Sequence, residues 1–172
     1  NLDSVNPAFF NGGSRVEYTR FVVNPVRETC KQTVLNNRVG EFPTMNNKFV
    51  GRKYTHAYSA GTIVKDDVKW GPNQCLVKHT TDPNSEAPAQ EQVWYYGERC
   101  FVQEPIFAPR PGATKEDEGW ILQVVNDAGA ETSTLHIFDA LDITKGPVAS
   151  VLFEGEHLPP GLHGMWAQDA VY

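Results

Sequence analysis

Short segments rich in β-branched and aromatic residues dominate the chain, and polar or turn-forming residues separate them. Such segments are typical of β-strands, which alternate side chains between two faces. No longer stretch shows the 3.6-residue apolar period of an amphipathic helix. The pattern therefore predicts an all-β fold, with strands over residues 15–23, 53–61, 75–81, 92–102, 119–127, 134–140 and 148–155.

A weak internal repeat runs through these segments. Three stretches share the order strand, turn, strand and loop, and they begin about sixty residues apart. Each leads to one titratable residue, and these residues recur at the same interval: Glu41, Glu104 and His163. An all-β period of this length is typical of the blades of a β-propeller. Because equivalent positions of successive blades converge on the central axis, we expect the three residues at one axial site.

The chain is too short for a closed propeller. At about sixty residues per blade, 172 residues supply fewer than three blades, whereas propellers close with roughly four to eight. We expect residues 1–172 to form a single partial domain of about three blade-sized repeats. Either the chain is the C-terminal part of a larger protein, or several copies assemble and cover the open strand edges.

Composition and charge narrow the class of function. Hydrophobic residues make up 40% of the chain, which predicts a globular domain, and the net charge of −6 argues against a nucleic-acid partner. No apolar run approaches the roughly 18 residues of a membrane-spanning helix. The three cysteines have no CxxC spacing, so neither a disulfide framework nor a zinc knuckle is indicated. A reducing, cytoplasmic location is expected.

One histidine stands on a stiff segment, EHLPPGLHGMW, at residues 156–166. Pro159 and Pro160 restrict the backbone, whereas Gly161 and Gly164 allow close approach to a neighbour. A neutral imidazole held in this way is a good ligand for iron, zinc or copper, so His163 is a candidate metal ligand. Taken alone, the segment also fits a plain loop histidine in a proline-rich turn.

Two glutamates occupy the positions of the repeat that match His163. Glu104 lies in FVQEPIFAP, where apolar residues flank its carboxylate, and Glu41 lies in VGEFPTM. A buried carboxylate needs a partner, and a metal-bound histidine is often anchored by a carboxylate through its second ring nitrogen. We therefore expect Glu104 to orient His163, and the alternative is that both glutamates end strands and face water.

The remaining titratable groups are assigned structural roles. His79 and His136 lie inside predicted strands, and His56 lies between two tyrosines. His157 is expected to be exposed. The run KEDEG at 115–119 could supply a carboxylate pair for acid–base chemistry, but it fits a solvated hairpin tip better. Motifs for a nucleophile elbow or a glycine-rich phosphate loop do not occur.

Three segments together resemble the C-terminal third of the carotenoid cleavage oxygenase family: VGEFPTMNNKFVGRKYTHAYSAG, QEPIFAPRPGATKEDEGWILQVVND and LPPGLHGMW. They follow the order and spacing of that family between Val16 and Trp166. The family includes carotenoid and apocarotenoid dioxygenases, lignostilbene dioxygenases and the retinoid isomerohydrolase of the eye.

The resemblance implies a seven-bladed β-propeller with a helical cap, in which four axial histidines bind ferrous iron and three glutamates orient them. His163 matches the last of the four ligands. Glu41 matches the glutamate of the family's G-E-F-P motif, and Glu104 matches that of its E-P-x-F motif. The other three histidines and the remaining glutamate lie upstream in the family, outside this chain. Leu162 stands where the family often has phenylalanine.

The resemblance also implies a reaction, the oxidative cleavage of a conjugated double bond, with Fe(II) as cofactor and a polyene and dioxygen as partners. A peripheral membrane contact would involve segments absent from this chain, and a plastid or membrane-associated location stays open beside the cytoplasmic one. With one ligand of four, the isolated chain is expected to be inactive. Two alternatives stay open. One is a non-catalytic propeller module for binding, with a vestigial metal site, and the other is a metal-free hydrolase that uses Glu41 and Glu104.

Overall fold

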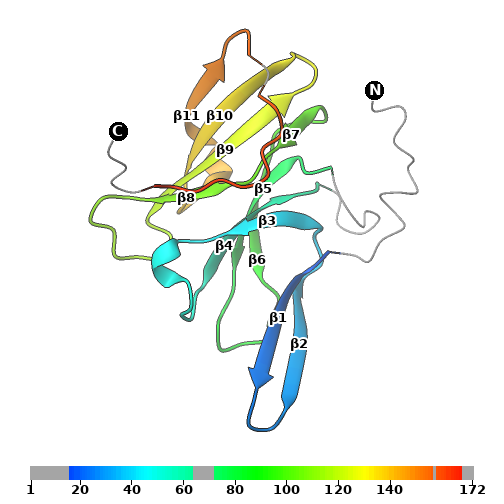
Figure 1. Cartoon of the computed structure of the whole chain (residues 1–172), viewed down its shortest axis with the longest axis vertical. Helices are drawn as coiled ribbons and strands as arrows, with labels where there is room; N and C mark the ends of the chain where they lie inside the picture. Colours follow the sequence, from blue (N-terminus) through cyan, green and yellow to red (C-terminus); the bar gives the residue numbers. More distant parts are fainter. Residues whose placement is uncertain (1–15, 64–71, 157, 168–172) are drawn as a thin grey trace, which may run out of the picture.

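The computed structural model describes residues 16–63, 72–156 and 158–167, and its strands form three antiparallel sheets (Figure 1). A two-stranded ribbon consists of β1 (Tyr18–Asn24) and β2 (Thr29–Asn36). A four-stranded sheet follows, in the order β3 (Gly40–Thr44), β4 (His56–Gly61), β5 (Cys75–Thr80) and β6 (Gln90–Tyr95). The last sheet contains β7 (Cys100–Val102), β8 (Ile106–Pro109), β9 (Gly119–Asp127), β10 (Thr132–Asp139) and β11 (Pro147–Phe153).

The described residues contain almost no helix, with 3-10 turns at Asn47–Phe49 and Ile143–Lys145. The prediction of an all-β fold is therefore confirmed. In the described part of the chain, no helix has the length and apolar character that crossing a membrane requires.

Three strands escaped the sequence prediction, and one predicted strand was wrong. β2 has few aromatic or β-branched residues, and both β3 and β8 contain a proline, which lowers strand propensity. The predicted strand over 92–102 is in fact two strands, β6 and β7, that belong to different sheets. Gly97 lies between them with φ of 125°, a backbone conformation that glycine adopts at little cost.

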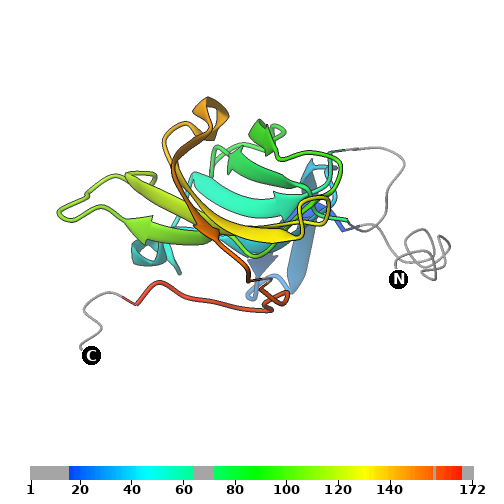
Figure 2. The ribbon, with the colours of Figure 1, turned by 90° about the horizontal axis from the view of Figure 1, so that it is seen from above.

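The main core lies between the four-stranded and the five-stranded sheets, which stack in the view of Figure 2. Trp94 and Tyr96 pack against this core from the end of β6. Fully burying a large apolar side chain contributes roughly 1.5–3 kcal/mol, so this cluster holds the two sheets together. Its buried members come from both sheets and from the turn after β10: Tyr58, Leu76, Phe107, Ile121, Phe138, Ala140 and Ile143.

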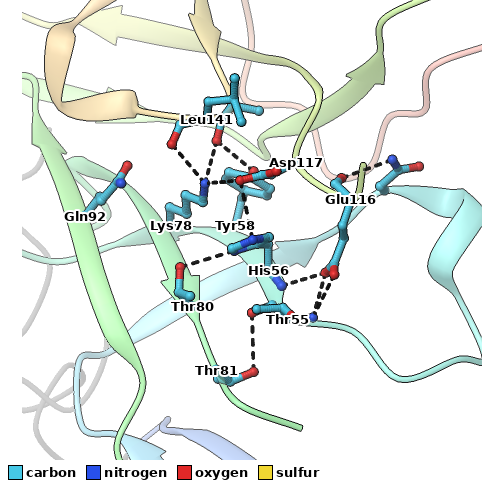
Figure 3. Close-up of polar contacts among 12 residues, drawn as sticks. Thr55, His56, Tyr58, Lys78, Thr80, Thr81, Gln92, Glu116, Asp117 and Leu141 are labelled. Atoms are coloured by element: carbon cyan, nitrogen blue, oxygen red, sulfur yellow. Dashed lines mark hydrogen bonds and ion pairs between the residues drawn. The ribbon is translucent and has the colours of Figure 1, made fainter. Parts of the chain in front are cut away.

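A buried polar cluster also joins the two sheets (Figure 3). The Lys78 side chain on β5 is only 3% exposed, and its Nζ donates to Asp117 Oδ2 at 2.9 Å. The same Nζ donates to the carbonyl oxygens of Ala140 at 2.9 Å and Leu141 at 3.0 Å. A charged amine in the interior is tolerated because all three of its donors are satisfied.

The loop that supplies this carboxylate contains KEDEG and joins the antiparallel strands β8 and β9, so the predicted hairpin tip is present. The prediction that this tip is solvated is wrong for Glu116 and Asp117, which make contacts with other parts of the protein. Glu116 Oε1 accepts hydrogen bonds from the backbone N–H groups of Thr55 at 2.8 Å and His56 at 2.6 Å. Asp117 faces Lys78 in the cluster described above. The loop is held because the unpaired N–H groups at the start of β4 lie opposite it, which only the tertiary structure brings about.

Candidate metal centre

Both predicted glutamates lie at one-residue bulges on the strands that begin the two larger sheets. On β3, Glu41 pairs with Ala60 and Thr44 pairs with Tyr58. The two residues between them, 42–43, therefore stand opposite the single residue 59. Between β7 and β8, residues 103–105 stand opposite two residues of β9. Bulges of this kind turn a side chain out of the regular ladder. Glu41 thus lies just before an interruption of its ladder and Glu104 lies within one, and their equivalence in the repeat stays a prediction.

Glu104 and His163 are brought together, although 59 positions separate them in the sequence. Glu104 Oε1 lies 3.2 Å from Nδ1 of His163, and Glu104 Oε2 accepts the backbone N–H of Gly164 at 2.6 Å. The Glu104 side chain is 17% exposed, whereas the His163 side chain is 71% exposed. An ionised carboxylate only accepts hydrogen bonds, so this contact places the hydrogen on Nδ1 and leaves the Nε2 lone pair available to a metal.

His163 lies on a segment without regular secondary structure, which we call the strap (residues 158–166) and which is red in Figures 1 and 2. The first anchor of the strap is the N–H of Leu158, which donates to Oγ of the fully buried Ser133 at 2.9 Å. The side chain of Gln103 contacts the strap between Pro159 and Gly161. The predicted close approach at the glycines is also present, because a Cβ on Gly164 would lie 2.9 Å from Ile106 Cδ1.

Glu41 forms no hydrogen bond with His163 among the residues that the structure describes. The next residue, Phe42, has a positive φ of 54°, which is uncommon for a residue with a large side chain. Its ring meets the His163 ring edge-on, with the centroids 6.1 Å apart. Glu104 thus contacts His163 directly, whereas the contact from β3 is made by Phe42, and the convergence of Glu41 on the same site stays a prediction.

A pocket of about 300 Å³ opens beside the histidine. Apolar side chains from β8, β9 and β10 line most of it, and Glu104 and His163 lie at its edge. A separate pocket of about 260 Å³ is lined by Glu41 together with Tyr18, Ser59 and His79. An apolar wall next to an imidazole and a carboxylate suits a hydrophobic ligand held near a polar or metal centre.

The described residues include no group of three or more histidine, cysteine, aspartate or glutamate side chains that could hold a metal ion. One imidazole with a carboxylate behind it fits a single position in a metal's ligand set, and the other ligands would come from elsewhere. The roles of His163 as ligand and of Glu41 and Glu104 as orienting residues stay predictions.

The other histidines lie where the sequence placed them. His79 is buried on β5 and its Nε2 lies 2.9 Å from Ser59 Oγ, while His136 on β10 contacts Ser150 Oγ at 2.8 Å. His56 contacts Thr80 Oγ1 at 3.2 Å. His157 lies outside the described residues.

Sequence reasoning missed two residues at this centre, Gln103 and Phe42. Each is adjacent to a predicted glutamate, in QEP and GEFP. The signal that could have revealed both is the proline one or two positions after each glutamate, which marks an interruption of the strand ladder.

Comparison with known proteins places this centre in a family. Residues 1–168 match the family described as retinal pigment epithelial membrane protein. The chain belongs to this family. It is 31% identical to apocarotenoid-15,15'-oxygenase of Synechocystis over 168 residues, which cover 98% of this chain and 31% of that protein. It is 32% identical to carotenoid cleavage dioxygenase 7 of Arabidopsis thaliana, covering 82% of this chain and 24% of that chloroplastic protein.

The structure agrees with the sequence comparison. The crystal structure of cobalt-substituted Synechocystis apocarotenoid oxygenase matches with a TM-score of 0.83 at 32% identity, over 98% of this chain and 33% of that one. The assignment of the sheets to blades of a β-propeller is thereby confirmed. The chain spans about a third of the length of these two Synechocystis proteins.

Proposed function

We propose that the complete protein is a non-haem Fe(II) dioxygenase that oxidatively cleaves a conjugated double bond of an apocarotenoid or related polyene. In this proposal His163 is one iron ligand and Glu104 orients it. The observation that carries the proposal is the contact between Glu104 Oε1 and His163 Nδ1 at 3.2 Å, in a chain that belongs to an oxygenase family. A carboxylate behind a ligating imidazole is the usual arrangement around a catalytic metal.

In this proposal the residues of this chain position the imidazole of His163 and exclude water from the space beside it. Glu104 accepts the hydrogen of Nδ1 and so selects the tautomer whose Nε2, directed away from the carboxylate, is free for a metal. The N–H of Gly164 satisfies the second oxygen of Glu104, so the carboxylate is fixed at both ends. The apolar wall formed by Ile106, Leu122 and Leu135 suits a hydrocarbon chain beside the imidazole. When bound, ferrous iron supplies the activation of dioxygen.

The two ladder interruptions extend the proposal to Glu41. Because Glu41 lies just before a bulge of β3 and Glu104 lies in the interruption between β7 and β8, both carboxylates stand where a ladder is broken, and Glu41 is suited to orient another imidazole. That imidazole would come from a part of the protein outside the described residues. The isolated chain, which supplies one ligand, is expected to hold no iron and to have no activity.

The test is the iron content of the complete protein after anaerobic reconstitution with ferrous iron. We expect one iron per protein in the wild type, loss of the iron in His163→Ala, and about 10- to 100-fold weaker binding in Glu104→Gln. His136→Ala is the matched control, since His136 is a strand histidine that contacts Ser150 and not the centre. Incubation of the loaded wild type with an apocarotenoid and dioxygen should yield two carbonyl products.

Retention of full iron in His163→Ala would refute the role of this histidine. A wild type that takes up no iron would favour the alternative of a non-catalytic propeller module. Cleavage that persists in the presence of a strong chelator and without bound iron would instead favour the metal-free reaction that uses the glutamates.

A further inference from the structure

The residue before Glu104 makes a second, separate contact with the strap. Nε2 of the Gln103 side chain donates to the carbonyl oxygen of Pro159 at 3.2 Å, and Oε1 accepts the N–H of Gly161 at 3.1 Å. A primary amide carries a donor and an acceptor side by side, so it can bind a backbone carbonyl and a backbone N–H at once. Pro160 has no N–H, and the amide therefore occupies the N–H of the first residue after the two prolines.

The Gln103 amide rests on a rigid base. The backbone N–H of Gln103 donates to the carbonyl oxygen of Val124 on β9 at 2.9 Å. The backbone carbonyl oxygen of Gln103 accepts a hydrogen bond from Nε2 of Gln123 at 2.8 Å. Gln123 is only 1% exposed, and its Oε1 accepts the hydroxyl of Tyr96 at 3.0 Å. Because both backbone groups of Gln103 are bound, the sheet fixes the point and direction from which its side chain leaves the backbone.

Gln103 and Glu104 together hold the strap on both sides of Leu162. Gln103 holds the backbone two residues before His163, and Glu104 holds the imidazole and the next N–H. Leu162 itself is 70% exposed and provides little anchoring. The other anchor, at Leu158, lies on the far side of both prolines. Without the amide, the path of the backbone into His163 would depend on Glu104 alone.

We propose that Gln103 is a positioning residue for His163, which clamps the strap through its side-chain amide and so sets where the imidazole stands. This proposal rests on the proposed function, in which His163 is a metal ligand. Metal ligands must be held to within about half an ångström of their working position, and residues behind the ligand supply that precision. The clamp is distinct from the glutamate, because it acts on the backbone and carries no charge.

The experiment compares Gln103→Met with the wild type in the complete protein. Methionine has a similar length but cannot form either hydrogen bond with the strap. The matched control is Gln74→Met, because the Gln74 amide also donates to two loop carbonyls, those of Gly97 and Glu98, and does not contact the strap. Gln103→Asn is a second variant that keeps the amide but shortens its reach by one methylene.

Cobalt(II) is the probe, because its visible absorption reports the geometry of its ligands. We expect Gln103→Met and Gln103→Asn to bind cobalt about tenfold more weakly than the wild type, with shifted absorption bands. The peptide spanning residues 158–166 should also exchange its amide hydrogens about tenfold faster in both variants. In Gln74→Met both quantities should stay within twofold of the wild type, at a similar melting temperature.

Wild-type cobalt affinity and spectrum in Gln103→Met would overturn the proposal. So would an equal loss in Gln74→Met, because the effect would then be one of general stability. If the wild type bound no metal, the proposed function would fail. Separately, unchanged amide exchange of the strap in Gln103→Met would show that the Gln103 clamp does not position the strap.

Discussion

Replacing Asp117 by asparagine removes the only carboxylate that contacts the buried amine of Lys78 among the described residues. Burial alone would raise the pKa of Asp117, but the hydrogen bond and charge of Lys78 and the nearby His56 outweigh it and lower that pKa. The carboxylate is thus charged in the native protein at neutral pH. The variant leaves Lys78 with two carbonyl acceptors and no negative charge.

Breaking a buried ion pair at one partner typically costs about 3–5 kcal/mol of unfolding free energy. The Asp117 side chain is 16% exposed and asparagine still offers an oxygen, so we expect the lower end, about 3 kcal/mol. Glu86→Gln is the matched control, because the Lys31–Glu86 pair has the same chemistry at side-chain exposures of 62% and 63%. An exposed pair contributes at most about 1 kcal/mol.

The assay is urea-induced unfolding of the complete protein, followed by circular dichroism and tryptophan fluorescence. The double variant Asp117→Asn with Lys78→Met should be less destabilised than the sum of the two single variants, because the coupled charges are removed together. Equal effects of Asp117→Asn and Glu86→Gln, or additive single variants, would refute the claim that this buried pair joins the two sheets.

Further predictions concern pH, packing and thiol reactivity. Burial, and then the charge of Lys78, lower the pKa of His56, so the unfolded state binds the proton more readily and the urea midpoint should fall as the pH drops below about 6.5. His56→Gln should flatten this dependence of the midpoint on pH, and an unchanged dependence would contradict the role given to His56. A Cβ on Gly119 would lie 2.7 Å from the carbonyl oxygen of Ala108, so Gly119→Ala should lower the free energy of unfolding by about 1–3 kcal/mol. An unchanged free energy of unfolding would show that the sheet makes room for the methyl group without strain. Burial raises the pKa of the Cys75 thiol to about 11, so its alkylation at pH 8 should be about 100-fold slower in the native protein than in urea. Equal alkylation rates in the two conditions would contradict the burial of this thiol.

Local sequence was a sufficient guide to strands rich in β-branched and aromatic residues, and a poor guide to strands that contain a proline. β9 and β10 have many β-branched and aromatic residues, and they were predicted because these residue types favour a pleated, half-buried surface. β3 and β8 each contain a proline and were missed, since their backbone pairing is imposed by the neighbouring strand. The same neighbouring strands define the ladder interruptions at which Glu41 and Glu104 lie.

The sequence by itself determined the all-β character of the chain, because strand formation follows from residue type, and its spacing predicted a repeat of about sixty residues with Glu41, Glu104 and His163 at matching positions. Only the tertiary structure decided which of them touch. The Glu104 contact with His163 joins a bulge to a strap 59 positions away, and its partners are chosen by the path of the backbone. The same holds for Gln103. The sequence does not indicate which groups its side-chain amide binds, because Pro159 and Gly161 come within its reach only in the folded protein.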